Sequence, residues 1–194
     1  MSTQTALIIL AAAALLSIAV VFGLAAARRK RTAHLKQRFG PEYDRAVAAQ
    51  GDASKAESHL EQREKRVEKL NIRPVPPELR ERFAASWLEV QARFVDEPAA
   101  AVVEADALVR KVMESRGYDT GSFEQGAADV SVNHPQAVEQ YRRAHAIAQK
   151  NERGEASTED LRQAFVQYRA LFDDLLGGAT PVVEVPELAA AGRG

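Results

Sequence analysis

The feature that most constrains this chain is an uncharged apolar run near its N-terminus. Residues 6–27 read ALIILAAAALLSIAVVFGLAAA, which is 22 positions without a charged side chain. As a helix rising about 1.5 Å per residue, the run would extend about 33 Å, and the hydrocarbon core of a bilayer is about 30 Å thick. The sequence therefore predicts a transmembrane helix at 6–27, preceded by a short extracytoplasmic N-terminus at 1–5.

A cleaved signal peptide is the alternative interpretation of this run, with Ala25-x-Ala27 as the cleavage site and the rest of the chain exported. Signal peptides begin with basic residues, and their apolar region usually spans about 7–15 residues. Residues 1–5 carry no charged side chain, and the apolar run is longer than that range. Both differences favour an uncleaved, single-pass anchor in the inner (cytoplasmic) membrane.

The segment after the run predicts its orientation. Six basic side chains follow within eleven residues and no acidic one interrupts them: Arg28, Arg29, Lys30, Arg31, Lys36 and Arg38. Because positive charge stays on the cytoplasmic side, the N-terminus is expected outside and the C-terminal domain in the cytoplasm. This membrane-flank cluster also suits anionic lipid headgroups, although any stop-transfer flank would look the same.

Small residues within the run suggest a way for two copies to associate. Ala19, Gly23 and Ala27 fall at the small-xxx-small spacing that lets two helices approach closely. The pattern predicts a homodimer through this face, but alanine is so frequent here that the spacing is weak evidence. The lipid bilayer is the partner expected for residues 6–27 as a whole.

The remaining chain reads as helices, so the predicted fold class is all-α. Pro41 begins a helix to about residue 49, and Asp52 caps a densely charged helix over 53–70, typical of an exposed connecting helix or a short coiled coil. Three prolines in 74–77 then end the helical stretch. We interpret 28–73 as a basic juxtamembrane segment and charged helical stalk.

Charge changes sign at this proline-rich boundary. Residues 28–73 hold 13 basic and 7 acidic side chains, whereas residues 74–194 hold 13 basic and 20 acidic ones. No basic face stands out after residue 74, which argues against nucleic acid as a partner. The chain has no cysteine, which excludes disulfides, iron–sulfur clusters, thiolate zinc sites and a cysteine nucleophile.

Four amphipathic helices are predicted in the distal part, at 77–95, 98–116, 135–154 and 158–176. Apolar residues recur every three or four positions in each helix, and Gly117 and Gly177 are suited to end two of them. Short connections pair the helices into two antiparallel hairpins, which predicts a four-helix bundle over 74–177. The Ala-, Gly- and Pro-rich stretch at 178–194 is predicted to be a disordered tail.

Several strings carry a resemblance to a known family: LKQRFGPEYDRAV (35–47), RPVPPELRERF (73–83), ARFVDEP (92–98), FEQGAADVSVNHPQAVEQYRRAHAIA (123–148) and TEDLRQAFVQYRALFDDLL (158–176). They resemble an uncharacterised family of bacterial single-span membrane proteins with a C-terminal helical domain. The resemblance implies a protein of the bacterial envelope. It implies no activity, cofactor or catalytic residue.

The connection at 118–134 is the strongest candidate for hidden chemistry, because 17 residues exceed the usual helix–helix loop. A carboxylate and an imidazole there can relay protons or bind a divalent metal. The structural alternative is that Ser122 caps a short helix, Asp129 is a local cap and His134 only begins the next helix. The candidate ligand or partner residues are Trp87, Tyr118, Asp129, His134, Tyr141 and His145, although buried core roles are commoner for such aromatics and histidines.

The sequence thus predicts a membrane-anchored cytoplasmic helical protein that acts as a structural or regulatory module binding another protein. A small-ligand or metal-sensing domain using residues 118–134 is the alternative, and a hydrolase ranks last. No catalytic motif such as HExxH, GxSxG or a Walker loop occurs, so no enzyme activity, cofactor or metal is predicted.

Overall fold

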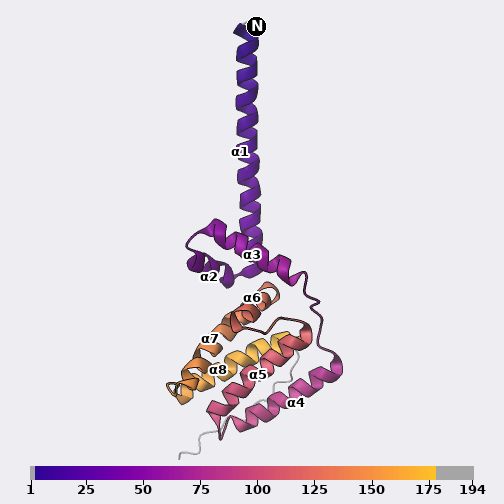
Figure 1. Ribbon diagram of the computed structural model, residues 1–194, viewed down its shortest axis with the longest axis vertical. Coiled ribbons are helices and arrows are strands. Elements are labelled where there is room, and N and C mark those ends of the chain that lie inside the picture. Colours follow the sequence, from indigo (N-terminus) through magenta and orange to yellow (C-terminus); the bar gives the residue numbers. More distant parts are fainter. Residues whose placement is uncertain (1–2, 178–194) are drawn as a thin grey trace, which may run out of the picture.

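The described part of the chain is entirely helical. The computed structural model describes the backbone of residues 3–177 and the side chains of residues 15–177. Within these residues there are eight helices and no strand, so the chain is all-α, as predicted (Figure 1). The predicted disordered tail at 178–194 lies outside the described residues.

The helices begin where the sequence provides starting signals. Their bounds are α1 Thr3–Phe39, α2 Pro41–Gln50, α3 Ala53–Val67, α4 Pro77–Arg93, α5 Pro98–Arg116, α6 Phe123–Asn133, α7 Pro135–Glu152 and α8 Thr158–Leu175. Four of them carry proline in the first turn, where its missing N–H is not needed. Three start at a side-chain cap, namely Asp52, Ser122 and Ser157.

The predicted transmembrane anchor is contradicted. No helix in the described part of the chain is long and apolar enough to cross a membrane. The predicted inner-membrane location, with the N-terminus out and the C-terminal domain cytoplasmic, depended on this span and is therefore contradicted as well.

Helices α4, α5, α7 and α8 share one hydrophobic core. α5 packs against α4 and α8, and α8 packs against α7. The largest side chains of this core are Trp87, Tyr141, Tyr168 and Phe172, each at most 2% exposed. The predicted buried faces of α5, α7 and α8 are largely observed, whereas the α4 face is only partly covered: Leu79 and Leu88 are exposed.

A second, smaller core joins the first three helices to α6. Its buried apolar residues are Leu35, Phe39, Tyr43, Ala46, Ala56, Leu60, Val67 and, from α6, Val132. Figure 1 shows α1 projecting from this group, with α2 and α3 at its base. The structure thus differs from the expected exposed connecting helix, because α3 uses its sparse apolar residues to pack against α1, α2 and α6.

The segment before α4 is held against the end of α5. Gly117 has φ +99°, a left-handed conformation that favours glycine. A Cβ at this position would lie 2.7 Å from the carbonyl oxygen of Asn71, and the N–H of Arg73 donates to the carbonyl of Arg116 at 2.9 Å. The absence of a side chain at Gly117 therefore lets residues 71–73, which directly precede the proline-rich segment, pack against the end of α5.

Candidate functional site

The long connection at 118–134 is mostly helical. α6 occupies Phe123–Asn133, and the Ser122 hydroxyl accepts a hydrogen bond from the N–H of Gln125 at 3.3 Å. This confirms the interpretation in which Ser122 caps a short helix. Only residues 117–122 remain as a connection, which is an ordinary length between helices.

Asp129 faces α3 from the interior of the protein. It is fully buried, and its carboxylate accepts from Arg66 Nε at 3.2 Å and from Gln125 Nε2 at 2.7 Å. The side chain therefore joins α6 to α3 rather than capping a helix. Arg66 also donates to Asp119 at 2.8 Å, so a single guanidinium holds two carboxylates of this region.

His134 belongs to a different polar cluster, between α6 and α7. Its Nδ1 lies 2.7 Å from Asp174 Oδ2, and its Nε2 lies 3.2 Å from a guanidinium nitrogen of Arg116. These partners assign a neutral ring that donates from Nδ1 and accepts at Nε2. Burial lowers the pKa of His134 below its usual value, Asp174 opposes that shift, and Arg116 adds to it.

The His134 cluster predicts a loss of stability in mild acid. The pKa of His134 is lower in the folded protein than in the unfolded chain, so the unfolded chain binds more protons as the pH falls below about 6.5. The free energy of unfolding is then highest above that pH and declines as the pH drops towards the folded-state pKa. We expect His134→Gln to show a shallower decline between pH 7.5 and 5 in urea unfolding curves.

A matched change at the exposed His34 of α1 provides the control. His34→Gln removes a side chain that is 62% exposed, so its unfolding curves should stay closer to those of the native protein than the curves of His134→Gln do. His59 and His145 also have lowered pKa values through burial, so a residual slope should persist in His134→Gln. An unchanged profile in His134→Gln would contradict the arrangement of neutral His134 between Asp174 and Arg116.

The other predicted candidates lie in or beside the main core. Tyr118 is buried, and its hydroxyl accepts from Asn133 Nδ2 at 3.1 Å. Trp87 stacks on Phe172 with ring centroids 4.6 Å apart, and Tyr141 contacts Phe123 and Tyr168. His145 is half-buried at the edge and stacks on Phe123 at 3.6 Å.

The six candidates therefore do not form one site. Tyr118 and His134 are neighbours, whereas Asp129, Trp87 and Tyr141 contact other groups. Among the residues whose side chains are described, no three histidine or carboxylate side chains are grouped to hold a metal ion.

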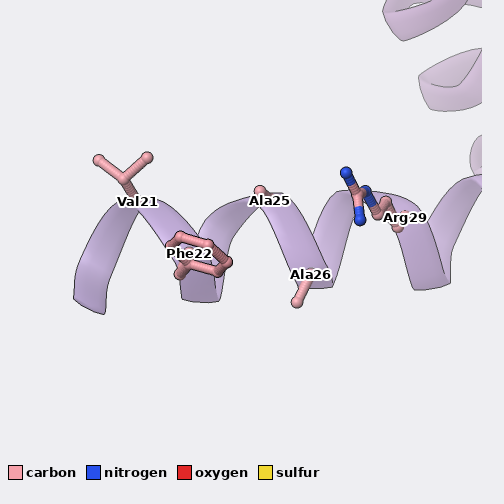
Figure 2. Close-up of a pocket in the computed structure, with 5 residues that line it drawn as sticks. All are labelled: Val21, Phe22, Ala25, Ala26 and Arg29. Carbon is pink, nitrogen blue, oxygen red and sulfur yellow. The ribbon is translucent and has the colours of Figure 1, made fainter. Parts of the chain in front are cut away.

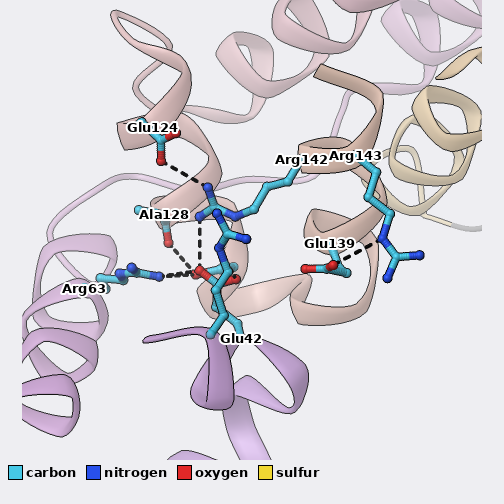
Figure 3. A network of polar contacts seen from close by, with 9 residues as sticks. Glu42, Arg63, Glu124, Ala128, Glu139, Arg142 and Arg143 are labelled. Atoms are coloured by element: carbon cyan, nitrogen blue, oxygen red, sulfur yellow. Dashed lines mark hydrogen bonds and ion pairs between the residues drawn. The ribbon is translucent and has the colours of Figure 1, made fainter. Parts of the chain in front are cut away.

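A buried ionic junction joins the two cores, and sequence reasoning did not identify it. Glu42 of α2 is 2% exposed and accepts from Arg63 of α3 at 2.8 Å and from Arg142 of α7 at 3.0 Å (Figure 3). Arg142 also donates to Glu124 of α6 at 3.1 Å, and Arg63 lies 3.3 Å from Ser131. One carboxylate therefore connects helices that are up to 100 residues apart in the chain.

The membrane-flank basic cluster divides into exposed and paired residues. Arg28, Arg29 and Lys30 are exposed on α1. Arg31 pairs with Glu57 and Glu61 of α3, and Arg38 pairs with Glu64 at 2.9 Å. Lys36 lies 5.3 Å from the ring centre of Tyr43. Half of the cluster thus helps to hold α1 against α2 and α3.

A hollow of about 360 Å³ on α1 lacks the enclosure of a ligand-binding site. Figure 2 shows that its lining residues all come from this one helix: Val21, Phe22, Ala25, Ala26 and Arg29. Ligand sites are concave because several elements converge on the ligand, and a single helix cannot enclose one. Gly23 in the same stretch has no atom within 4 Å of the position of a Cβ, and the homodimer through Ala19, Gly23 and Ala27 stays a prediction.

A groove between α4 and α8 is the most distinctive surface feature. It has a volume of about 580 Å³. Its apolar lining consists of Leu88, Ala92, Phe94, Val95, Phe165 and Val166. Its polar rim consists of Gln91, Arg162 and Arg169, and Arg169 donates to Gln91 at 3.1 Å. We refer to these nine residues as the α4–α8 groove.

Four of the six apolar groove residues are exposed, whereas Phe94 is half-buried and Phe165 is buried beneath them. Leu88 is 51% exposed, Val166 is 55% exposed and Val95 is 82% exposed. Contiguous apolar surface with a polar rim is typical of an interaction site. The sequence did provide one signal, because Leu88 and Val95 widen the apolar arc of α4 beyond what one buried face needs.

The chain was also compared with known proteins. No protein-family model, no curated protein and no solved structure matches it. The resemblance to a bacterial membrane-protein family therefore stays a prediction.

Proposed function

We propose that this protein is a helical interaction module that binds a segment of another protein in the α4–α8 groove. In this proposal α4, α5, α7 and α8 act as a four-helix bundle that presents the groove. The observation that supports it is the exposed apolar lining of the groove, flanked by two arginines. Apolar anchors surrounded by a charged rim are the usual composition of a protein-binding surface.

The wall of the groove is rigid, which favours binding without large rearrangement. Phe165 packs against Phe94 with ring centroids 4.9 Å apart and against Trp87 at 5.0 Å. Trp87 in turn stacks on Phe172 in the buried core. Because the aromatic side chains are already ordered, a partner would lose little binding free energy to ordering this surface.

The rim defines the chemistry of the partner. Arg162 and Arg169 both belong to α8 and border the apolar lining on one side. A segment that fills the groove would place apolar side chains on Phe165 and Val166 and acidic side chains beside the arginines. We therefore propose a partner segment that combines both residue types, because charge complementarity at the rim determines orientation and specificity.

Selection from a random peptide library displayed against the purified full chain tests this proposal. The enriched peptides should combine aliphatic with acidic residues. Their affinity should fall about tenfold or more in Val166→Asp, because the new carboxylate removes an apolar contact, repels the acidic side chains of the peptides and competes with them for Arg162 and Arg169. Isothermal titration of the best peptides against both chains measures the loss.

Val103→Asp is the matched control, since Val103 of α5 is 51% exposed and does not line the groove. This variant should bind the peptides with native affinity. If the peptides bound Val166→Asp as well as the native chain, or lost affinity equally in Val103→Asp, the groove would not be the binding surface.

The alternative, a ligand or metal sensor at residues 118–134, has no comparable support. Arg66 and Gln125 bind Asp129, and Arg116 and Asp174 bind His134. Both side chains are thus engaged in joining helices. A ligand there would have to displace these contacts.

A further inference from the structure

We propose that residues 181–188 of this same chain bind in the α4–α8 groove and compete there with the partner. This inference rests on the proposed function of the groove and specifies how access to it is regulated. The segment reads Pro-Val-Val-Glu-Val-Pro-Glu-Leu, which combines four aliphatic side chains with two acidic ones. It therefore has the composition that the groove and its two arginines require.

The chain leaves α8 at the right place to enter the groove. A Cβ at Gly177 would lie 4.0 Å from Arg80 Nη2, so the end of α8 lies beside the first turns of α4. Trp87 contacts both Phe165 and Phe172, and Phe94, further along α4, contacts Phe165. α4 and α8 thus run in opposite directions, and a chain that turns back at Gly177 follows the groove from Leu88 towards Val95.

The connecting length also matches. From Arg80 to Leu88, α4 rises about 12 Å over eight residues. Residues 178–181, when extended, span about 13 Å. Val182 therefore reaches the level of Leu88, where the groove begins, and the following residues continue along it.

The apolar residues of the segment recur with the period of an extended proline-type helix. That conformation, which Pro181 and Pro186 favour, has three residues per turn. Val182, Val185 and Leu188 then lie on one face, which would contact the lining of the groove. Grooves that bind such segments in other proteins are lined by aromatic rings, as Phe94 and Phe165 line this one.

The charges of the segment and of the rim have similar spacing. Glu184 and Glu187 are three residues apart, which is about 9 Å in the extended proline-type helix. Arg162 and Arg169 are seven residues apart on α8, which is about 10 Å. Since the segment runs antiparallel to α8, Glu184 would face Arg169 and Glu187 would face Arg162.

Existing contacts of the two arginines do not prevent this pairing. Arg162 pairs with Glu159 one turn earlier, and Arg169 lies 3.3 Å from Asp173. Arg162 and Glu159 are both more than half exposed. Pairs on a helix surface contribute little to stability, so the exposed guanidinium of Arg162 can turn to the segment at small cost. Arg169 is 26% exposed and also donates to Gln91, so its rearrangement costs more.

Disulfide trapping in the full chain tests the proposal, because the native chain has no cysteine. The test variant carries Val166→Cys and Val185→Cys, which the proposed register brings together. The matched variant carries Val103→Cys and Val185→Cys. Under mild oxidation at low protein concentration, we expect the first pair to cross-link about tenfold faster, since docking raises the local concentration of one thiol around the other. Gel mobility without reductant measures both rates.

A charge exchange in the first cysteine variant provides the second measurement. Arg162→Glu with Arg169→Glu should slow the cross-link about tenfold, and adding Glu184→Lys with Glu187→Lys should restore it. The proposal would be overturned if the Val166–Val185 and Val103–Val185 cysteine pairs cross-linked at equal rates. It would also be overturned if the glutamate-to-lysine exchange did not restore the rate that the arginine-to-glutamate exchange had lowered. A covalent dimer in place of an internal cross-link would also overturn it, because the segment would then occupy the groove of a second copy.

The proposed function and this inference can fail separately. If selected peptides bind the groove but the Val166–Val185 cross-link is slow, only the inference about residues 181–188 is wrong. If the cross-link is fast and the selected peptides bind elsewhere, the groove serves the chain itself and the proposed partner site is wrong. If both hold, oxidised Val166→Cys/Val185→Cys should bind the selected peptides at least about tenfold more weakly than its reduced form.

Discussion

Glu42→Ala is expected to lower the free energy of unfolding by about 3–5 kcal/mol, because it removes one partner from a buried ionic network. Glu42 is 2% exposed and accepts from both Arg63 and Arg142. Without its carboxylate, the buried guanidinium of Arg142 would keep only Glu124, which is exposed on α6. Urea unfolding followed by circular dichroism at 222 nm measures the change.

An exposed ion pair on α7, the helix that carries Arg142, provides the comparison. Glu139 and Arg143 of α7 lie 3.2 Å apart, and Figure 3 shows them beside the junction. Arg143 is mostly exposed, so Glu139→Ala should cost less than about 1 kcal/mol. Similar losses for Glu42→Ala and Glu139→Ala would contradict the assignment of the junction as a buried network.

Replacing both charges separates the cost of an orphaned charge from the value of the pair. In Glu42→Leu combined with Arg142→Met, the charged groups of the most buried pair of the junction are removed together. Such apolar replacements of buried ion pairs are often close to neutral, because the cost of desolvating the charges disappears as well. The double variant is therefore expected to be more stable than Glu42→Ala.

The junction also accounts for the difference between the expected stalk and the observed fold. The densely charged α3 reads as a solvated helix, because its arginines and glutamates dominate its composition. In the structure, Arg63 and Arg66 reach carboxylates on α2 and α6, and α3 becomes part of the packed molecule. Charge content alone therefore predicts exposure only where no oppositely charged group lies across an interface.

Local features of the sequence were sufficient to predict most helix boundaries. Proline in the first turn, side-chain caps and glycine after the last turn depend on backbone geometry within about four residues. Ser157 and Asp160 form a capping box at the start of α8, and α7 begins at Pro135 as predicted. These signals depend on neighbouring residues only, which is why one sequence reveals them.

The buried junction and the α4–α8 groove were not predictable in the same way. Glu42 and Arg142 are 100 residues apart, and no local sequence pattern predicts that their side chains are in contact. The groove depends on how far α4 and α8 separate, which leaves Leu88 and Val166 uncovered although their spacing suits a buried face. Contacts between distant segments follow from packing of the whole chain, and helical periodicity does not specify them.

Trp87→Ala is expected to lower the free energy of unfolding by about 3–5 kcal/mol, through lost transfer energy and the cavity left behind. Trp87 is 2% exposed and stacks between Phe165 and Phe172 at 5.0 and 4.6 Å. Phe165 of this stack also lines the α4–α8 groove. Peptide binding at the groove should therefore weaken together with stability in this variant.

The neighbouring residue is the control for this prediction. Leu88 is 51% exposed on the same helix, so Leu88→Ala should cost less than about 1 kcal/mol. It should nevertheless weaken binding of the selected peptides, because Leu88 lines the groove. A loss of stability below about 1 kcal/mol in Trp87→Ala would mean that the ring does not support the core. A binding loss in Leu88→Ala without a stability loss would instead assign its side chain to recognition.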